Sequence, residues 1–128
     1  GLMWKNADSY LHLDKWLSWD EAKVYVKVLN QEGFADYEDW KMPTRKEALT
    51  IYEPSSPLTD PFGDVIYLPS VFSAGAGQTS WTKTIHKTDL KLAIRFNYFN
   101  GDFKWYKKGL KSHGVRPVRV FKKIEKEK

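Results

Sequence analysis

The chain has 128 residues, the usual size of a single domain, and its 41% apolar and 16% aromatic content predicts one core rich in rings. It contains no cysteine, which excludes disulfides, thiolate zinc sites and a cysteine nucleophile, and no stretch approaches the roughly 20 apolar residues that a membrane helix needs. The net charge of +5 is uneven, because residues 1–80 carry seven Lys/Arg against twelve Asp/Glu, whereas residues 81–128 carry fourteen against four. We therefore expect the C-terminal part to meet an anionic partner.

Two capping boxes predict two helices. Residues 18–21 (Ser-Trp-Asp-Glu) allow reciprocal hydrogen bonds between side chain and backbone at a helix start. Apolar residues follow at helical spacing until Gly33, which predicts a helix over residues 19–32. Residues 44–47 (Thr-Arg-Lys-Glu) repeat the box and predict a second helix, which Pro54 keeps short.

The region after the second helix predicts a long loop and then strands. Residues 54–78 contain four Pro and three Gly, which indicates an irregular excursion of the kind that often carries function. Strands are predicted at residues 80–85 and 115–121. We expect one domain over residues 1–121, followed by a charged tail at residues 122–128.

A β-hairpin is predicted around Asn100-Gly101, a pair typical of a two-residue type I′ turn between alternating strands. That turn places Phe96 opposite Trp105. The side chains expected on one buried face are Phe96, Tyr98, Phe103 and Trp105. The other face then presents Arg95 against Tyr106, Asn97 against Lys104 and Ala93 against Lys108. Trp19, Trp40 and Trp81 are assigned to the core together with Phe96 and Trp105.

Several segments, taken in order, resemble the bacterial collagen-like adhesin C-terminal family. They are Gly1-Leu2-Met3-Trp4, Ser18-Trp19-Asp20-Glu21-Ala22, Gly33 with Asp39-Trp40-Lys41-Met42-Pro43-Thr44, Lys46-Glu47, Ser80-Trp81-Thr82, Asn100-Gly101 and Val115-Arg116-Pro117-Val118-Arg119. The resemblance implies an α+β, C-type-lectin-like fold, with two helices packed on a small antiparallel β-sheet and a long irregular loop region. It also implies an extracytoplasmic or cell-surface location and a binding role without a reaction. Lys41 replaces the usual Arg of that family, so a bidentate ion pair there would be lost.

The residues that common catalytic and metal sites require do not have the necessary spacing. His12, His86 and His113 are dispersed, and the chain contains neither His-x-x-x-His nor Gly-x-Ser-x-Gly. The acidic residues within 36–39 fit a turn better than a calcium loop, and Glu53-Pro54-Ser55 lacks the partner motif of calcium-dependent lectins. We therefore expect no enzyme activity, no metal site and no cofactor.

The basic face of the hairpin is the predicted ligand-binding site, and its residues are Arg95, Lys104, Tyr106, Lys108, Lys91 and Asn97. Cations beside a ring suit sulfated or carboxylated sugars, so the hypothesis is a non-catalytic module that recognises an anionic glycan or a cell-surface polymer. The alternative is a structural or assembly domain of a surface protein that docks an acidic protein partner, and an ordinary solvated strand face is also consistent with the pattern. Nucleic acid ranks lower because no recognition helix is predicted. A homo-oligomer is left open.

Overall fold

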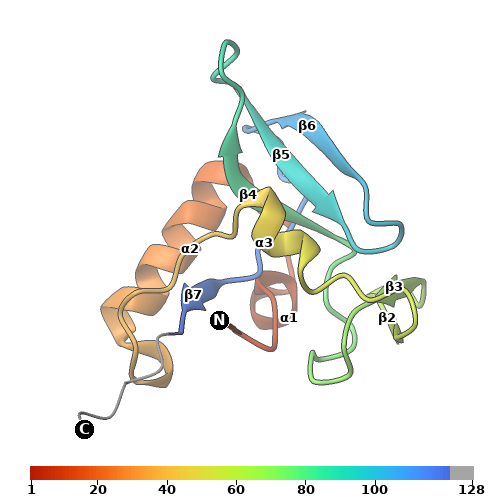
Figure 1. Cartoon of the computed structure of the whole chain (residues 1–128). Coiled ribbons are helices and arrows are strands. Elements are labelled where there is room, and N and C mark those ends of the chain that lie inside the picture. The colour runs from red at the N-terminus through yellow and green to blue at the C-terminus, as the bar shows by residue number, and fades with distance from the viewer. Residues whose placement is uncertain (122–128) are drawn as a thin grey trace, which may run out of the picture.

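The computed structural model describes residues 1–121 and has the predicted α+β class, with helices and three small antiparallel sheets (Figure 1). In chain order the elements are β1 (Leu2–Trp4), α1 (Ser9–Leu13), α2 (Trp19–Glu32), the 3-10 helix η1 (Phe34–Asp36), α3 (Arg45–Leu49), β2 (Pro57–Thr59), β3 (Val65–Tyr67), β4 (Thr79–Ile85), β5 (Leu92–Asn97), β6 (Phe103–Lys107) and β7 (Val118–Val120). The predicted charged tail lies outside the described residues. Among the residues described, none of the helices has the length and apolar character to cross a membrane.

Both predicted capping boxes are present. Ser18 Oγ accepts a hydrogen bond from the Glu21 backbone N–H at 3.2 Å, and Glu21 Oε1 accepts one from the Ser18 N–H at 2.9 Å. Thr44 and Glu47 make the same pair of bonds, at 3.1 and 2.9 Å, at the start of α3. The backbone of Gly33 is left-handed, with φ of 63°, and ends α2 where predicted. These local signals are sufficient because each box satisfies backbone donors that the helix itself leaves unpaired.

Lys41 makes an ion pair, although the resemblance implied an Arg at this position. Lys41 Nζ donates to Glu47 Oε2 at 2.9 Å, a single bond in place of a bidentate one. Burial would raise the pKa of Glu47, but the bonds from Lys41 and from the Thr44 backbone outweigh burial and lower that pKa. The capping carboxylate of α3 is thereby also tied to the segment before it.

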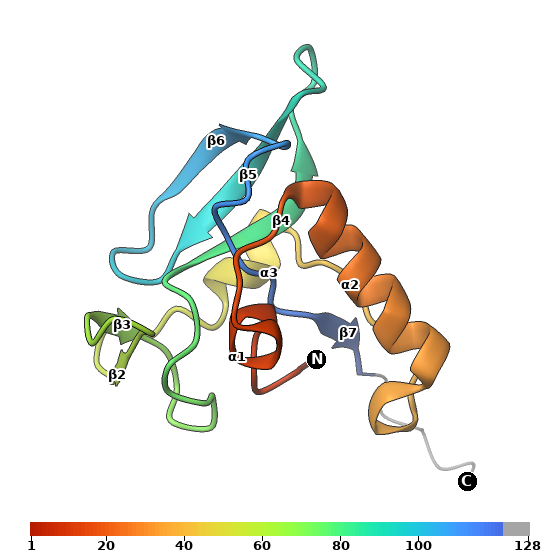
Figure 2. The same cartoon turned by 180° about the vertical axis from the view of Figure 1, so that it is seen from behind.

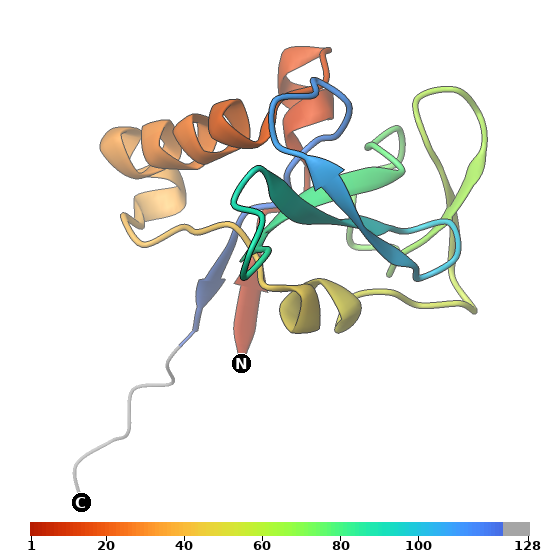
Figure 3. The ribbon, with the colours of Figure 1, turned by 90° about the horizontal axis from the view of Figure 1, so that it is seen from above.

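The first 14 residues contain two elements that the sequence did not reveal. β1 pairs antiparallel with β7, with Leu2 opposite Val120, so the first strand lies beside the last one (Figure 3). α1 has only five residues, and Asp8 caps it by accepting from the Leu11 N–H at 3.0 Å. The other oxygen of Asp8 accepts from the Gly77 N–H at 2.8 Å. Such a short helix without a capping Glu gives too weak a local signal to predict.

The hairpin of β5 and β6 is present, but its register differs from the predicted one by two residues. Phe96 lies opposite Phe103 and not opposite Trp105. The connection is correspondingly longer than a two-residue turn, since the Asn97 N–H donates to the Asp102 carbonyl at 2.8 Å. A shift of two leaves every side chain on its expected face but changes its cross-strand partner.

Tyr98 explains the longer turn. Its backbone N–H donates to the Gln78 carbonyl and its carbonyl accepts from the Tyr67 N–H, each at 2.8 Å, so Tyr98 pairs outside the hairpin. Its ring is fully buried, and Gly101, with φ of 78°, turns the chain back toward β6. Tyr98 therefore pairs with residues that are distant in the chain, although the local pattern predicts that it belongs to the β5–β6 ladder.

The predicted buried face is correct on β5 and wrong on β6. Phe96 and Tyr98 are buried, whereas Phe103 and Trp105 are 45% and 42% exposed. The two rings of β6 are exposed because α3 packs on β4 and β5, whereas β6 is the edge strand of the sheet. Seen from above, α2 and α3 lie on opposite sides of this sheet (Figure 3).

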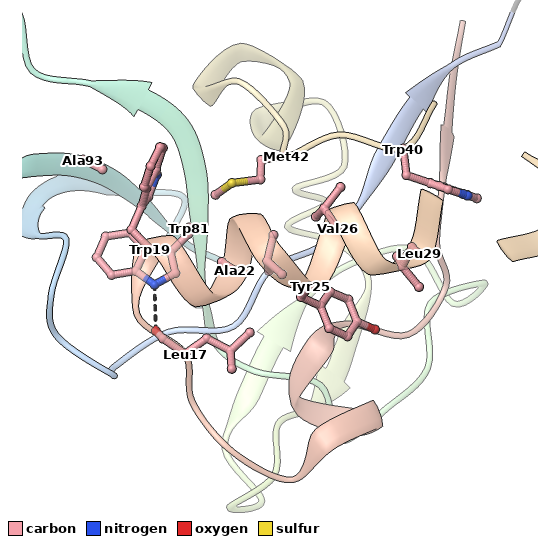
Figure 4. Packing of buried hydrophobic residues seen from close by; sticks show 11 residues of the cluster. Leu17, Trp19, Ala22, Tyr25, Val26, Leu29, Trp40, Met42, Trp81 and Ala93 are labelled. Atoms are coloured by element: carbon pink, nitrogen blue, oxygen red, sulfur yellow. Dashed lines mark hydrogen bonds between the residues drawn. The ribbon is translucent and has the colours of Figure 1, made fainter. Parts of the chain in front are cut away.

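The buried apolar residues form two clusters. Trp19, Trp40, Trp81 and Phe96 are buried as predicted. The first cluster lies between α2 and the sheet, where the Trp81 Nε1–H donates to the Leu17 carbonyl at 2.8 Å (Figure 4). The second contains Ala48, Ile51, Ile66, Leu68, Phe72, Phe96 and Tyr98. The two faces of β5 thus contribute to different clusters, Ala93 to the first and Phe96 to the second.

The segment predicted as an irregular loop, residues 54–78, contains the β2–β3 hairpin, which lies at the end of the molecule away from α2 (Figure 2). Ile66 and Leu68 are fully buried in the second cluster. Asp60 Oδ1 accepts from the backbone N–H groups of Phe62 and Asp64, both at 2.8 Å, and fixes the turn. Much of the segment is therefore structural.

Candidate ligand-binding site

The predicted basic face is not one exposed surface, because Arg95 is buried. Its side chain is 6% exposed and lies over the Tyr106 ring, 5.1 Å from the ring centroid. The cause is the segment around His113, which runs along the open edge of β4: the Gly114 N–H donates to the Thr79 carbonyl at 3.1 Å. The His113 ring then packs edge-on against Tyr106 at 4.9 Å and closes this side of the sheet.

The other predicted site residues make different contacts and do not form one surface. Asn97 Oδ1 accepts from the Phe99 N–H at 2.8 Å and stabilises the turn. Lys108 Nζ lies 4.4 Å from a ring centroid of Trp19. Tyr106 is half-buried against the first cluster, and Lys104 is exposed. Lys91 and Lys108 meet at a different place, a groove of about 530 Å³ at the end of the hairpin.

Burial also changes the chemistry of His113. Desolvation first, and then the nearby charge of Arg95, lower the pKa of His113 from 6.5 to about 4. Its Nδ1 lies 2.6 Å from Thr79 Oγ1, while Nε2 is buried with no hydrogen-bond partner among residues 1–121. Nε and Nη1 of Arg95 are likewise buried without a hydrogen-bond partner among residues 1–121. This cluster is a feature of the core and not a surface that a polymer can reach.

A second basic and aromatic surface lies on the opposite face of the sheet. We call it the α3–β6 groove: it has a volume of about 530 Å³ and is lined by Thr44, Arg45, Lys46, Thr84, Ile85, His86, Lys87, Ile94 and Trp105. α3 supplies Arg45 and Lys46 through its first turn, which the Thr44 cap holds in place. The β4–β5 turn, which follows Ile85, supplies His86 and Lys87.

The two exposed rings of β6 are each contacted by a basic side chain at this groove. The guanidinium carbon of Arg45 lies 4.2 Å from the Phe103 ring centroid. The His86 ring meets Trp105 edge-on, with centroids 4.8 Å apart. Arg45 and Phe103 form a cation–π pair, which fixes the position of a cation without neutralising its charge.

The cations of the α3–β6 groove form no ion pair within residues 1–121. Its lining contains no Asp or Glu. The ion pairs of residues 1–121 are Lys41–Glu47, Lys111–Glu21 and Arg119–Asp39, so Arg45, Lys46 and Lys87 take part in none. Three positive charges around a half-exposed tryptophan are thus available to an anion.

His86 adds a hydrogen-bond donor to the wall of this groove. Its Nδ1 accepts from the backbone N–H groups of Thr88 at 3.2 Å and of Asp89 at 3.0 Å. A ring nitrogen that accepts such bonds carries no proton, so the neutral ring carries its proton on Nε2. The β4–β5 turn therefore sets which nitrogen of His86 can donate to a ligand.

Two other grooves have a different character. One, of about 570 Å³, lies between α1 and α2, and exposed Val24 and Val28 contribute to its apolar wall. The other is acidic and contains Arg119, which is paired with Asp39 and stacked on Tyr37. Neither combines an exposed ring with unpaired cations.

Sequence reasoning missed the α3–β6 groove because Trp105 was assigned to the core. A signal was available: β6 follows the turn of a hairpin and becomes an edge strand, where large apolar side chains are exposed unless another element covers them. Nothing local, by contrast, indicates that Arg45 and Lys46 approach β6, since about 60 residues separate them in the chain.

The chain matches the model of the Lcl C-terminal domain family over residues 1–119. No match was found among curated proteins. The matched range contains every element of the described fold except the end of β7, and both walls of the α3–β6 groove. The chain therefore belongs to the Lcl C-terminal domain family.

Proposed function

We propose that this domain is a non-catalytic binding module that recognises an anionic glycan or cell-surface polymer through the α3–β6 groove. The observation that carries the proposal is the environment of Trp105: its ring is 42% exposed and lies in a groove with Arg45, Lys46 and Lys87, none of which is paired with a carboxylate of residues 1–121. The predicted chemistry is thus kept, while its location moves to the other face of the sheet.

The groove has the two features that a sulfated or carboxylated sugar requires. Arg and Lys pair with the anionic groups by charge-assisted hydrogen bonds. The flat face of Trp105 offers an apolar surface to a sugar ring, and the Nε2–H of His86 beside it can donate to a hydroxyl. Association through these contacts needs no proton transfer and no nucleophile.

The finer features of the sequence resemblance belong to this proposal. A C-type-lectin-like fold and an origin in a collagen-like adhesin agree with the α+β architecture and with membership of the Lcl C-terminal domain family. A location at the cell surface, where such polymers occur, is part of the same proposal.

The proposal is tested with immobilised heparin as the polyanion. The variant Arg45→Gln/Lys46→Gln/Lys87→Gln should elute at markedly lower salt than the original chain, because fewer counterions are released when it binds. Its free energy of unfolding should fall by no more than about 1 kcal/mol, because Arg45→Gln removes the contact with Phe103 and the other two side chains are exposed. A matched variant, Lys15→Gln/Lys23→Gln/Lys27→Gln, removes the same charge from the α1–α2 side and should elute nearly unchanged.

Trp105→Ala separates glycan recognition from simple charge attraction. It should weaken binding to heparin oligosaccharides about tenfold, which is the effect of removing one stacking aromatic side chain from a site for single-stranded nucleic acid. Binding to linear polyphosphate should be almost unchanged. Phe62→Ala, at another exposed ring, is its control. If the triple variant and Trp105→Ala both behave like the original chain, the α3–β6 groove is not a glycan site. Retention of an acidic protein but not of heparin would support docking of an acidic partner instead.

A further inference from the structure

Two exposed leucines share the groove at the end of the hairpin. Leu90 is 68% exposed and Leu110 is 47% exposed, and both line this groove of about 530 Å³. We call it the hairpin-end groove, and its lining comes from residues 89–92 and 107–110. Single exposed apolar side chains are common on protein surfaces, but large apolar side chains that gather in one place, with polar residues around them, mark a site of interaction.

Backbone hydrogen bonds join the two walls of the hairpin-end groove. The Lys108 N–H donates to the Lys91 carbonyl at 2.8 Å, and Leu92 lies opposite Lys107 in the ladder. The Leu110 N–H donates to the Lys107 carbonyl at 3.2 Å and closes a turn directly after β6. The exposed leucines are therefore presented by hydrogen-bonded turns on neighbouring segments.

Lysines lie beside the two leucines. Lys91 and Lys107 line the groove, are exposed and form no ion pair with the carboxylates of residues 1–121. Asp89, the one acidic residue of the lining, accepts from the Lys91 backbone N–H at 3.1 Å. Lys108 is engaged with the Trp19 ring. The groove thus combines aliphatic surface with positive charge, and its lining contains no aromatic ring.

This combination fits the surface of a lipid bilayer with anionic headgroups better than it fits a polysaccharide. A sulfated sugar offers no apolar phase that could receive a leucine, and the groove offers no ring on which a sugar could stack. A bilayer accepts leucines at the boundary of its acyl chains, while lysines reach the headgroups through their long apolar stems. The β4–β5 turn projects from the upper end of the molecule in Figure 1, where a flat membrane can reach it.

We propose that the hairpin-end groove is a peripheral membrane-binding site, which inserts Leu90 and Leu110 among the lipids of an anionic bilayer while Lys91 and Lys107 pair with the headgroups. The inference goes beyond the proposed function, since it concerns a different groove and a different class of partner. Both kinds of side chain are needed, because peripheral binding depends on the apolar area buried together with the attraction to anionic lipid.

The experiment measures how the full chain partitions onto sedimented vesicles, made either of phosphatidylcholine alone or of an equimolar mixture with phosphatidylglycerol. The original chain should bind the anionic vesicles much more tightly than the neutral ones. Leu90→Ser/Leu110→Ser should weaken this binding about tenfold, because the apolar area buried in the bilayer is lost. The matched control Val24→Ser/Val71→Ser, at side chains that are 56% and 75% exposed, should bind like the original chain.

The contribution of the lysines is measured on the same vesicles. Lys91→Gln/Lys107→Gln should bind roughly 20-fold more weakly, since each lysine close to an anionic surface contributes about fivefold. Lys15→Gln/Lys27→Gln removes the same charge from the α1–α2 side and should have a much smaller effect, because attraction to the surface falls off within a Debye length.

A fluorescent label reports insertion directly, since the chain has no cysteine of its own. Gly109→Cys lies beside Leu110 and tolerates a side chain, because a Cβ there meets no atom within 4 Å. An environment-sensitive fluorophore on this thiol should emit at shorter wavelength on anionic vesicles and be unchanged by heparin. The same fluorophore on Ser70→Cys, at an exposed serine outside the groove, should shift with neither.

Three outcomes would overturn this inference, and each leaves the test of the α3–β6 groove intact. If the leucine variant binds vesicles like the original chain while the lysine variant does not, the lysines only attract anions and no insertion occurs. If the original chain does not bind anionic vesicles, the hairpin-end groove is not a membrane site. If the leucine variant loses retention on heparin as well as on vesicles, the groove is part of the glycan site.

Discussion

The guanidinium carbon of Arg45 lies 4.2 Å from the centroid of the Phe103 ring, and this contact joins the first turn of α3 to the edge strand β6. The two residues come from parts of the chain that share no local signal, yet Phe103 supports the Arg45 side chain that lines the α3–β6 groove. The ring holds the long Arg45 side chain in place before a ligand arrives, which lowers the entropy lost on binding.

This contact should appear as a coupling energy. In a double-mutant cycle with Arg45→Ala and Phe103→Ala, we expect the pair to contribute about 0.5–1 kcal/mol to the free energy of unfolding, the range for exposed cation–π pairs. Urea denaturation measures all four variants. Lys46→Ala replaces Arg45→Ala in a control cycle and should show a coupling near zero, because Lys46 lies over no aromatic ring of residues 1–121. A coupling of zero for Arg45 would mean that the ring does not hold the cation.

Removal of the two helix caps should affect stability alike and binding differently. Ser18→Ala and Thr44→Ala should each lower the free energy of unfolding by about 1 kcal/mol, because each leaves a backbone N–H of the first turn without its acceptor. Thr44→Ala should also weaken heparin binding, since Arg45 lies in the turn that would fray. Ser18→Ala should not, because α2 is outside the groove.

Urea denaturation and heparin titration of the same samples measure both effects. Ser70→Ala, at an exposed serine, is the control and should change neither quantity. Equal losses of heparin affinity in the two cap variants would show that global stability, and not the position of α3, governs binding.

Stability should fall with acid because of His113. Its pKa is lowered from 6.5 to about 4 in the folded chain, first by burial and then by the charge of Arg95, so between these values the unfolded chain binds a proton that the folded chain does not. The stability contributed by neutral His113 is therefore present above pH 6.5 and is lost as pH falls toward 4. The loss should be on the order of 3 kcal/mol. Urea denaturation at a series of pH values measures it, and the NMR signals of the ring report its charge directly.

Arg95→Met provides the matched comparison for His113. It removes a buried positive charge whose Nε and Nη1 lack partners among the described residues, so stability at neutral pH should be unchanged or slightly higher. The pKa of His113 should rise toward its ordinary value, which makes the loss of stability between pH 6.5 and 4 smaller than in the original chain. Heparin affinity should not change, since Arg95 is buried. A large loss of heparin affinity in Arg95→Met would return the ligand site to the face predicted from sequence.

The sequence alone determined those features that depend on nearby residues. The boxes at Ser18 and Thr44 start helices because a side chain three residues on completes each cap, and Gly33 ends α2 because it accepts a left-handed backbone. The strand at residues 80–85 was predicted, and alternation over residues 90–99 predicted the strand that the structure shows at Leu92–Asn97. The α+β class, the basic C-terminal part and the family resemblance could also be predicted from the sequence.

Only the tertiary structure decided the register of the hairpin and the location of the candidate site. Tyr98 leaves the ladder because its backbone finds Gln78 and Tyr67, which are distant in the chain. Arg95 is buried because the segment around His113 closes one face of the sheet. Trp105 stays half-exposed because α3 packs mainly on β4 and β5 and leaves the edge strand β6 partly uncovered. Alternation assigns a side chain to a face, but which face is covered depends on segments that arrive from elsewhere in the chain, and no local pattern contains that information.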